Sequence, residues 1–128
     1  MFALTLDDSA KINVTSRQHQ FNFAVDGSAP NPLEATFAAI VACAGVYARK
    51  ACLSLKCSPA GIKINTRLAV RPDNPMMPSK ITTDITFPTT FSEDQRKAVM
   101  ASVLDCPVKS LISHGAEVDF VFNVKEPA

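Results

Sequence analysis

Residues 31–55, NPLEATFAAIVACAGVYARKACLSL, decide the fold. Asn31 is a good helix N-cap, Pro32 suits the first helical position, and Glu34 complements the positive end of the helix dipole. The body is rich in alanine, and its apolar residues recur at spacings of three and four. At 1.5 Å per residue such a helix runs roughly 36 Å, the width of a small domain. The pattern therefore predicts one long helix, buried at the centre of the molecule.

Length and composition indicate an ordinary globular protein. The 128 residues are 47% hydrophobic and 20% charged, enough for one domain over residues 1–128 with a core of its own. The formal net charge is +1 without any run of Lys or Arg, so binding to nucleic acid or to an anionic membrane is not expected. No apolar run reaches the length of a membrane span, and Asp7–Asp8 follow too soon for a signal peptide. These features predict a cytoplasmic protein.

The chain has four cysteines: Cys43, Cys52, Cys57 and Cys106. No two are spaced as C-x-x-C, and no histidine lies near enough in sequence to complete a common zinc site. A metal or other cofactor is therefore not expected. Cys52 lies nine residues after Cys43, about 180° around the helix, and is not expected to pair with it. Cys57 follows in a loop and is interpreted as incidental.

Short alternating segments on both sides of the long helix predict a largely antiparallel sheet. Before the helix, strands are expected at residues 2–6, 11–15 and 21–25. After it, residues 62–71 and 79–87 are expected to form a hairpin. The connecting segment, residues 72–78, contains three prolines and is expected to be a loop. A last strand is expected at residues 118–125.

Two further helices are expected after the second hairpin. Ser92 is a good N-cap with Asp94 and Gln95 in the first turn, which predicts a helix over residues 92–104. Pro107 then breaks this helix and begins a short third one, because proline disfavours a helical residue before it. The order βββ-α-ββ-αα-β has no regular βα alternation. It indicates an α+β fold, with antiparallel sheet wrapped around the long helix.

Cys43 and Cys106 are the cysteines whose surroundings suggest chemistry. Cys43 lies halfway along the long helix among alanines and a glycine, which leave room beside the sulfur for a crossing helix or a substrate. Cys106 precedes Pro107 at an expected helix N-terminus, where free N–H groups and the dipole favour a thiolate. Each has a structural alternative: a core thiol for Cys43 and a helix cap for Cys106. As a pair they suggest one thiol to be oxidised and one to resolve it.

The segments NPLEATFAAIVAC (31–43) and CPVKSLI (106–112) resemble motifs of the OsmC/Ohr family of thiol-dependent peroxidases. The order of strands and helices is similar to that family over nearly the whole chain. The resemblance implies an OsmC-like fold and an intertwined homodimer, with two central helices packed inside sheets built from both chains. It also implies that Cys43 is the peroxidatic thiolate and that Cys106 resolves its sulfenate as a disulfide.

The chain departs from the organic-hydroperoxide branch of that family where the thiolate is activated. In that branch a Glu follows N-P directly and helps an Arg to hold the thiolate; here this position is Leu33 and the acid is Glu34. Glu34 lies nine residues before Cys43, on the opposite side of an ideal helix, so it is better suited to capping than to supporting the thiol. N-P-L-E is instead similar to the less characterised OsmC-like branch.

Another cation is then needed to hold Cys43 ionised, because a mid-helix thiol gains nothing from the helix dipole. Lys50 lies on the same face about 10 Å along the axis, better placed for the partner chain's thiol if two helices cross antiparallel. Arg17 and Arg49 are further candidates, and each of the three cations can equally be a surface charge. Tyr47, one turn after Cys43, can donate a hydrogen bond to the sulfur or the peroxide, or simply belong to the core.

These features favour a two-cysteine thiol peroxidase acting on small organic hydroperoxides, with an external dithiol reopening the disulfide. The apolar side chains expected around Cys43 are Phe37, Ile40, Val46 and Tyr47. Their chemistry favours apolar substrates over hydrogen peroxide. Two alternatives remain: a non-catalytic dimer that binds an apolar small molecule in the same pocket, and a thiol redox sensor whose disulfide switches a partner.

Overall fold

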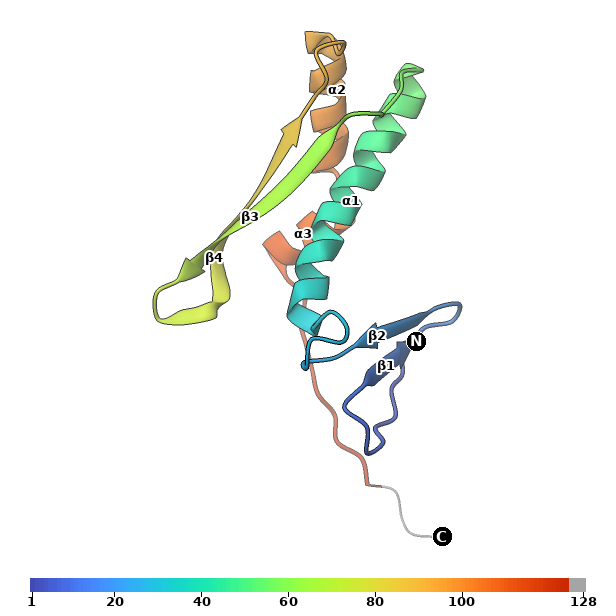
Figure 1. Ribbon diagram of the computed structural model, residues 1–128, viewed down its shortest axis with the longest axis vertical. Helices are drawn as coiled ribbons and strands as arrows, with labels where there is room; N and C mark the ends of the chain where they lie inside the picture. Colours follow the sequence, from blue (N-terminus) through green and yellow to red (C-terminus); the bar gives the residue numbers. More distant parts are fainter. Residues whose placement is uncertain (125–128) are drawn as a thin grey trace.

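The computed structural model describes residues 1–124 and is built around helix α1, Pro32–Leu55 (Figure 1). Asn31 caps this helix as predicted, because its side-chain oxygen accepts a hydrogen bond of 2.8 Å from the Glu34 N–H. The helix ends where Lys56 adopts the left-handed conformation, with φ of 56°. The long helix expected from the sequence is confirmed from cap to cap.

Two separate antiparallel hairpins make up the β structure. Strands β1, Ile12–Thr15, and β2, Gln20–Phe23, form the first, close to two of the predicted strands. Strands β3, Lys63–Arg71, and β4, Asn74–Thr86, form the second. Figure 1 shows the β3–β4 hairpin alongside α1 and the β1–β2 hairpin near its N-terminal end. The chain is α+β as predicted, although its strands form two small sheets.

The turn of the second hairpin is shorter than the sequence predicts. The expected loop over residues 72–78 is wrong, because β4 begins at Asn74 and contains Pro75 and Pro78. Both strands of a two-stranded hairpin are edges, where a residue without an N–H is tolerated. The pairing also shifts register on both sides of Val70, and such an irregularity relaxes the hydrogen-bonding pattern near the prolines.

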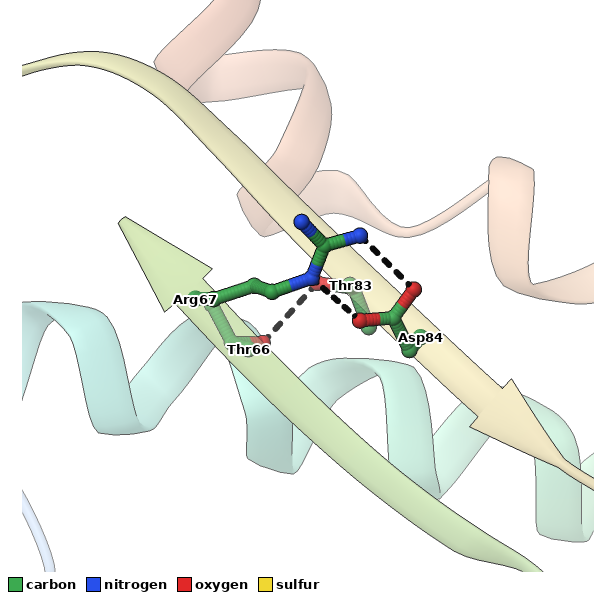
Figure 2. Close-up of polar contacts among 4 residues, drawn as sticks. All are labelled: Thr66, Arg67, Thr83 and Asp84. Atoms are coloured by element: carbon green, nitrogen blue, oxygen red, sulfur yellow. Dashed lines mark hydrogen bonds and ion pairs between the residues drawn. The ribbon is translucent and has the colours of Figure 1, made fainter. Parts of the chain in front are cut away.

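Cross-strand polar pairs fix the register of the β3–β4 hairpin (Figure 2). The Arg67 guanidinium donates to both carboxylate oxygens of Asp84, at 2.7 and 3.2 Å. This hydrogen bonding holds the pKa of Asp84 below its ordinary value. On the other face of the hairpin, the hydroxyl oxygens of Thr66 and Thr83 lie 2.9 Å apart. The ion pair is largely exposed, so it contributes to register more than to stability.

The two expected terminal strands do not form in the described chain. Residues 2–6 make a single isolated bridge, from Ala3 to the end of β1. Residues 118–124 have no regular structure, and Phe120 is 95% exposed. Lys125, the final residue of the predicted strand, lies outside the described residues. A strand needs a neighbour to pair its N–H and C=O groups; within residues 1–124, residues 118–124 have none, and residues 2–6 have only the single Ala3–Thr15 bridge.

Two helices follow the second hairpin, as expected. Helix α2, Glu93–Leu104, begins with a capping box in which Ser92 and Gln95 each accept a hydrogen bond from the other's main chain, at 3.1 and 2.8 Å. Helix α3, Pro107–His114, begins at the predicted break. Helix α2 packs along α1, where the Ser102 hydroxyl donates to the Tyr47 carbonyl at 2.8 Å.

The core lies between α1, α2 and the segment that precedes α2. Its buried residues are Ala48, Ala51, Cys52, Phe91 and Val99. The residues from α1 are small, which lets α2 approach closely, while one aromatic ring and one valine fill the remaining space. The Phe91 ring also packs against the Phe87 ring, and the two ring centroids lie 5.4 Å apart. The core that positions the site is therefore compact and small.

Helix α1 is less enclosed than the sequence predicts. Only five of its residues are buried, and side chains such as Val46 and Leu53 are largely exposed. Figure 1 shows the reason, because α2, α3 and the β3–β4 hairpin all lie on one side of α1. By length and composition alone α1 is also apolar enough to cross a membrane, contrary to the expectation that no segment is. Core helices of soluble proteins pass the same test.

Candidate functional site

The structure places Cys43 and Cys106 side by side, at disulfide-forming distance, although 63 positions separate them in sequence. Cys43 lies midway along α1, and Cys106 is the residue before the first turn of α3. Their Cα atoms are 6.2 Å apart, within the range that a disulfide requires. Packing of α3 against α1 therefore brings together the two thiols that the sequence singled out.

The local structure weighs against the purely structural alternatives for both cysteines. Cys106 occupies the N-cap position of α3, but its side chain makes no capping hydrogen bond. It is 2% exposed, and its sulfur faces Cys43 instead of the α3 main chain. Cys43 is half-buried and does not belong to the core cluster. Neither sulfur is used as a cap or as part of the main core.

An apolar cavity of about 260 Å³ lies beside this pair. Four elements form its wall: α1, β4, α2 and the start of α3. The lining residues are Ile40, Ala44, Ile81, Thr83, Ile85, Met100, Val103, Leu104, Cys106 and Lys109. Mostly apolar walls with a few polar groups are typical of small-molecule sites. Larger hollows of about 530 and 460 Å³ lie near the β1–β2 hairpin and the start of α1, but neither cysteine lines them.

The polar groups of the cavity are a hydroxyl, a thiol and an ammonium group. Thr83 contributes the hydroxyl, which is held by its contact with Thr66 on the neighbouring strand (Figure 2). Cys106 contributes the thiol, and Lys109 contributes the cation. Lys109 is exposed at the cavity wall, where its positive charge modestly favours an anion inside the cavity.

Lys109 is a residue that the sequence interpretation missed. It lies three residues after Cys106 in α3, so the two side chains share one side of the helix. The spacing C-P-V-K at an expected helix start carries this signal, since residues three apart are helical neighbours.

The cations proposed from the sequence lie elsewhere in the described chain. Lys50 Nζ lies over the Tyr47 ring, 5.5 Å from its centroid, and both side chains line a different hollow between α1 and α2. Arg17 lies in the exposed turn between β1 and β2, and Arg49 is exposed on α1. Glu34 is an exposed first-turn residue of α1, as expected for a capping role. None of these five residues lines the cavity.

The predicted apolar lining is only partly right. Of the four side chains expected around the reactive thiol, Ile40 alone lines the cavity. Val46 points outward, and Tyr47 belongs to the other hollow. Helix α1 contributes Ile40 and Ala44, which are four residues apart and therefore on one face. The remaining walls come from segments that are distant in sequence.

Residues 1–124 contain no cluster of three His, Cys, Asp or Glu side chains able to hold a metal ion.

Comparison with known proteins gives the fold and the family. The chain matches the structure of an OsmC-like protein from Mycoplasma pneumoniae with a TM-score of 0.69 and 14% sequence identity, over 88% of this chain and 86% of the other. It matches a hypothetical protein from Aquifex aeolicus with a TM-score of 0.70 and 20% identity, over 89% of this chain and 86% of the other. It also matches an organic hydroperoxide resistance protein from Legionella pneumophila, described as a predicted redox protein, with a TM-score of 0.55 and 16% identity over 88% of each chain. No curated protein is significantly similar. The sequence profile of OsmC-like proteins matches residues 25–121. The chain therefore belongs to the OsmC-like protein family, which includes hydroperoxide resistance and redox proteins.

Proposed function

We propose that this protein is a two-cysteine thiol peroxidase that reduces small organic hydroperoxides. One observation carries the proposal: Cys43 and Cys106 lie at disulfide-forming distance beside an apolar cavity. The family includes hydroperoxide resistance and redox proteins, which supports the same chemistry. The sequence motif N-P-L-E favours the less characterised OsmC-like branch as the place of this chain in the family.

The proposed reaction balances with two thiols and one hydroperoxide. The Cys43 thiolate attacks a peroxide oxygen, the O–O bond breaks, and the alcohol leaves with a proton while Cys43 becomes a sulfenic acid. The Cys106 thiolate then attacks this sulfur, and water leaves as the disulfide forms. An external dithiol reopens the disulfide by two exchange steps and becomes oxidised. The cytoplasm, where thiols are kept reduced, suits this cycle.

The cavity offers an apolar binding site and polar groups next to the Cys106 sulfur. Its volume of about 260 Å³ and its aliphatic walls suit the alkyl or aryl part of a small hydroperoxide. The Thr83 hydroxyl can donate a hydrogen bond to a peroxide or alcohol oxygen. The Lys109 ammonium group at the cavity wall and the N-terminus of α3 both favour negative charge on the Cys106 sulfur. No cofactor takes part in the proposed cycle.

Thiol counting tests this proposal directly. The reduced chain carries four thiols, and we expect one equivalent of cumene hydroperoxide to remove two of them within seconds. Peptide mapping then assigns the loss to Cys43 and Cys106, because only these two thiols lie beside the cavity and at disulfide distance from one another. A chain that keeps all four thiols while it binds the compound is instead a non-catalytic binding protein.

We also propose that the protein is a homodimer. The apolar side chains of residues 118–124 are 72–95% exposed, and apolar side chains of α1 and of the start of β4, such as Val46, Leu53 and Met76, are 61–70% exposed. The apolar side chains of residues 118–124 follow one another in sequence, and exposed apolar patches are typical of protein–protein interfaces. The main chain of residues 118–124 is also unpaired within the described chain, which leaves it able to add to a sheet edge of a second copy. We expect the second copy to cover the exposed side of α1 as well.

Sedimentation equilibrium tests the dimer. We expect the wild-type chain to be dimeric at micromolar concentration and Phe120→Ser to weaken the dimer about ten- to a hundredfold, because burial of a Phe side chain contributes about 1.5–3 kcal/mol. Asp119→Ser is the matched control, since the neighbouring side chain lies on the opposite face of an extended segment. A wild-type monomer, or equal effects of the two substitutions, contradicts the proposal.

A further inference from the structure

Two cysteines outside the proposed active site meet at the end of α1. The Cys57 N–H donates a hydrogen bond of 3.0 Å to the Cys52 carbonyl, and the Lys56 N–H donates one of 3.2 Å to the Leu53 carbonyl. With Lys56 in the left-handed conformation, these two bonds define a Schellman ending of the helix. This motif brings the side chains of its first and last residues together, and here both are cysteines.

The two thiols differ in their access to solvent. Cys52 is 0% exposed within the core cluster, whereas Cys57 is half-buried and packs against that cluster from outside. Burial raises the pKa of the Cys52 thiol, and the contact with the Cys57 thiol raises it further. An external reagent therefore reaches Cys57 first, and Cys52 waits behind it as a protected thiol.

An apolar pair at these two positions is the usual companion of a Schellman ending, and two packing cysteines satisfy that role. Two thiols in contact, one of them reachable from solvent, are also the arrangement in which a disulfide forms within one chain by thiol–disulfide exchange. The main-chain hydrogen bond between the two residues involves neither sulfur, so it is compatible with both the dithiol and the disulfide. The pair is separate from the proposed active site, because Cys52 and Cys43 lie on opposite sides of α1, about 13 Å apart along its axis.

We propose that Cys52 and Cys57 form a second redox site, which closes to a disulfide by exchange with a low-molecular-weight disulfide of the glutathione type. The Cys57 thiolate attacks one sulfur of the external disulfide, its S–S bond breaks, and one external thiol leaves. The Cys52 thiol then loses its proton and attacks the Cys57 sulfur of the mixed disulfide, and the second external thiol leaves. The chain loses two electrons and two protons, and the external disulfide gains them.

This site responds to the thiol–disulfide state of the solution and needs no hydroperoxide. Its disulfide joins Cys52, in the last turns of α1, to Cys57, in the segment that leads into β3. Because Cys52 belongs to the buried cluster, oxidation attaches this segment covalently to the core. Because the inference does not depend on the peroxidase reaction, failure of one leaves the other standing.

The tryptic map of the chain tests the second site cleanly. Trypsin cuts after Lys50, Lys56 and Lys63, so Cys52 is released in ACLSLK (51–56) and Cys57 in CSPAGIK (57–63). The wild-type protein is equilibrated with excess glutathione disulfide, its free thiols are alkylated during denaturation, and it is digested without reduction. We expect the two peptides to appear as one linked species that separates on reduction.

Two variants identify the order of events. In Cys52→Ser we expect Cys57 to keep a glutathione mixed disulfide, because no second thiol displaces it. In Cys57→Ser we expect Cys52 to remain a free thiol, because it is buried. In the wild-type map, unlinked alkylated peptides, a stable glutathione adduct on Cys57, or linkage of either peptide to Cys43 or Cys106 overturns the proposal. The wild-type result decides the matter even if a variant fails to fold.

Discussion

Replacing Cys43 by Ser removes hydroperoxide turnover, and replacing Cys106 by Ser stops the reaction after one oxidation. A serine hydroxyl is far less acidic than a thiol and is not oxidised by peroxide, so Cys43→Ser should lower turnover roughly a thousandfold or more. In Cys106→Ser the sulfenic acid forms but finds no resolving thiol. Consumption of cumene hydroperoxide with dithiothreitol as reductant measures the first effect. A single-turnover experiment without reductant, with dimedone to trap the sulfenic acid, measures the second.

The dimedone adduct also tests which sulfur attacks the peroxide. Cys106 lines the cavity and Cys43 lies beside it, so the assignment of attack to Cys43 depends on the resemblance to the family motif. An adduct on Cys43 in Cys106→Ser supports that assignment, whereas an adduct on Cys106 in Cys43→Ser reverses the two roles. Cys57→Ser is the matched control, since this cysteine is remote from the cavity and should leave turnover unchanged. Full turnover by Cys43→Ser would falsify the mechanism.

Local interactions made the helices predictable. Asn31 before Pro32, and Ser92 three residues before Gln95, are capping signals whose partners lie within one turn. The structure contains both caps as expected. The approach of Cys106 to Cys43 spans 63 positions, and no local rule predicts it. The surroundings of each cysteine suggested that the two act as a pair, and the resemblance of two short motifs to a known family implied that they form a disulfide.

The strands were harder to predict, because a period of two indicates a half-buried environment without saying which chain supplies the partner. Residues 118–124 alternate clearly, yet the described chain offers them no neighbour. The opposite error occurred at residues 74–78, where two prolines suggested a loop but an edge strand tolerates them. Lys109 escaped notice for a further reason: its place in the cavity wall depends on α3 packing against three other elements.

Replacing Phe91 by Ala should lower the free energy of unfolding by about 3–4 kcal/mol. Phe91 is 6% exposed and is the largest of the five buried residues in the cluster between α1 and α2, so its truncation leaves a cavity that its neighbours fill only in part. The loss is a large fraction of the roughly 5–15 kcal/mol by which a domain of this size is stable. Urea denaturation at one fixed protein concentration measures it, since a dimer makes stability depend on concentration.

The substitution isolates the ring, because the local main chain keeps its support. The Arg96 guanidinium donates to the Phe91 carbonyl at 2.7 Å, and the Phe91 N–H donates to the Pro88 carbonyl at 3.1 Å; neither bond involves the side chain. Phe21→Ala is the matched control, because that ring is 42% exposed on the β1–β2 hairpin and should cost under about 1 kcal/mol. The cluster around Phe91 holds α2 against α1, and the start of α3 with Cys106 follows directly after α2. Equal losses of stability for the two variants would contradict this role of the cluster.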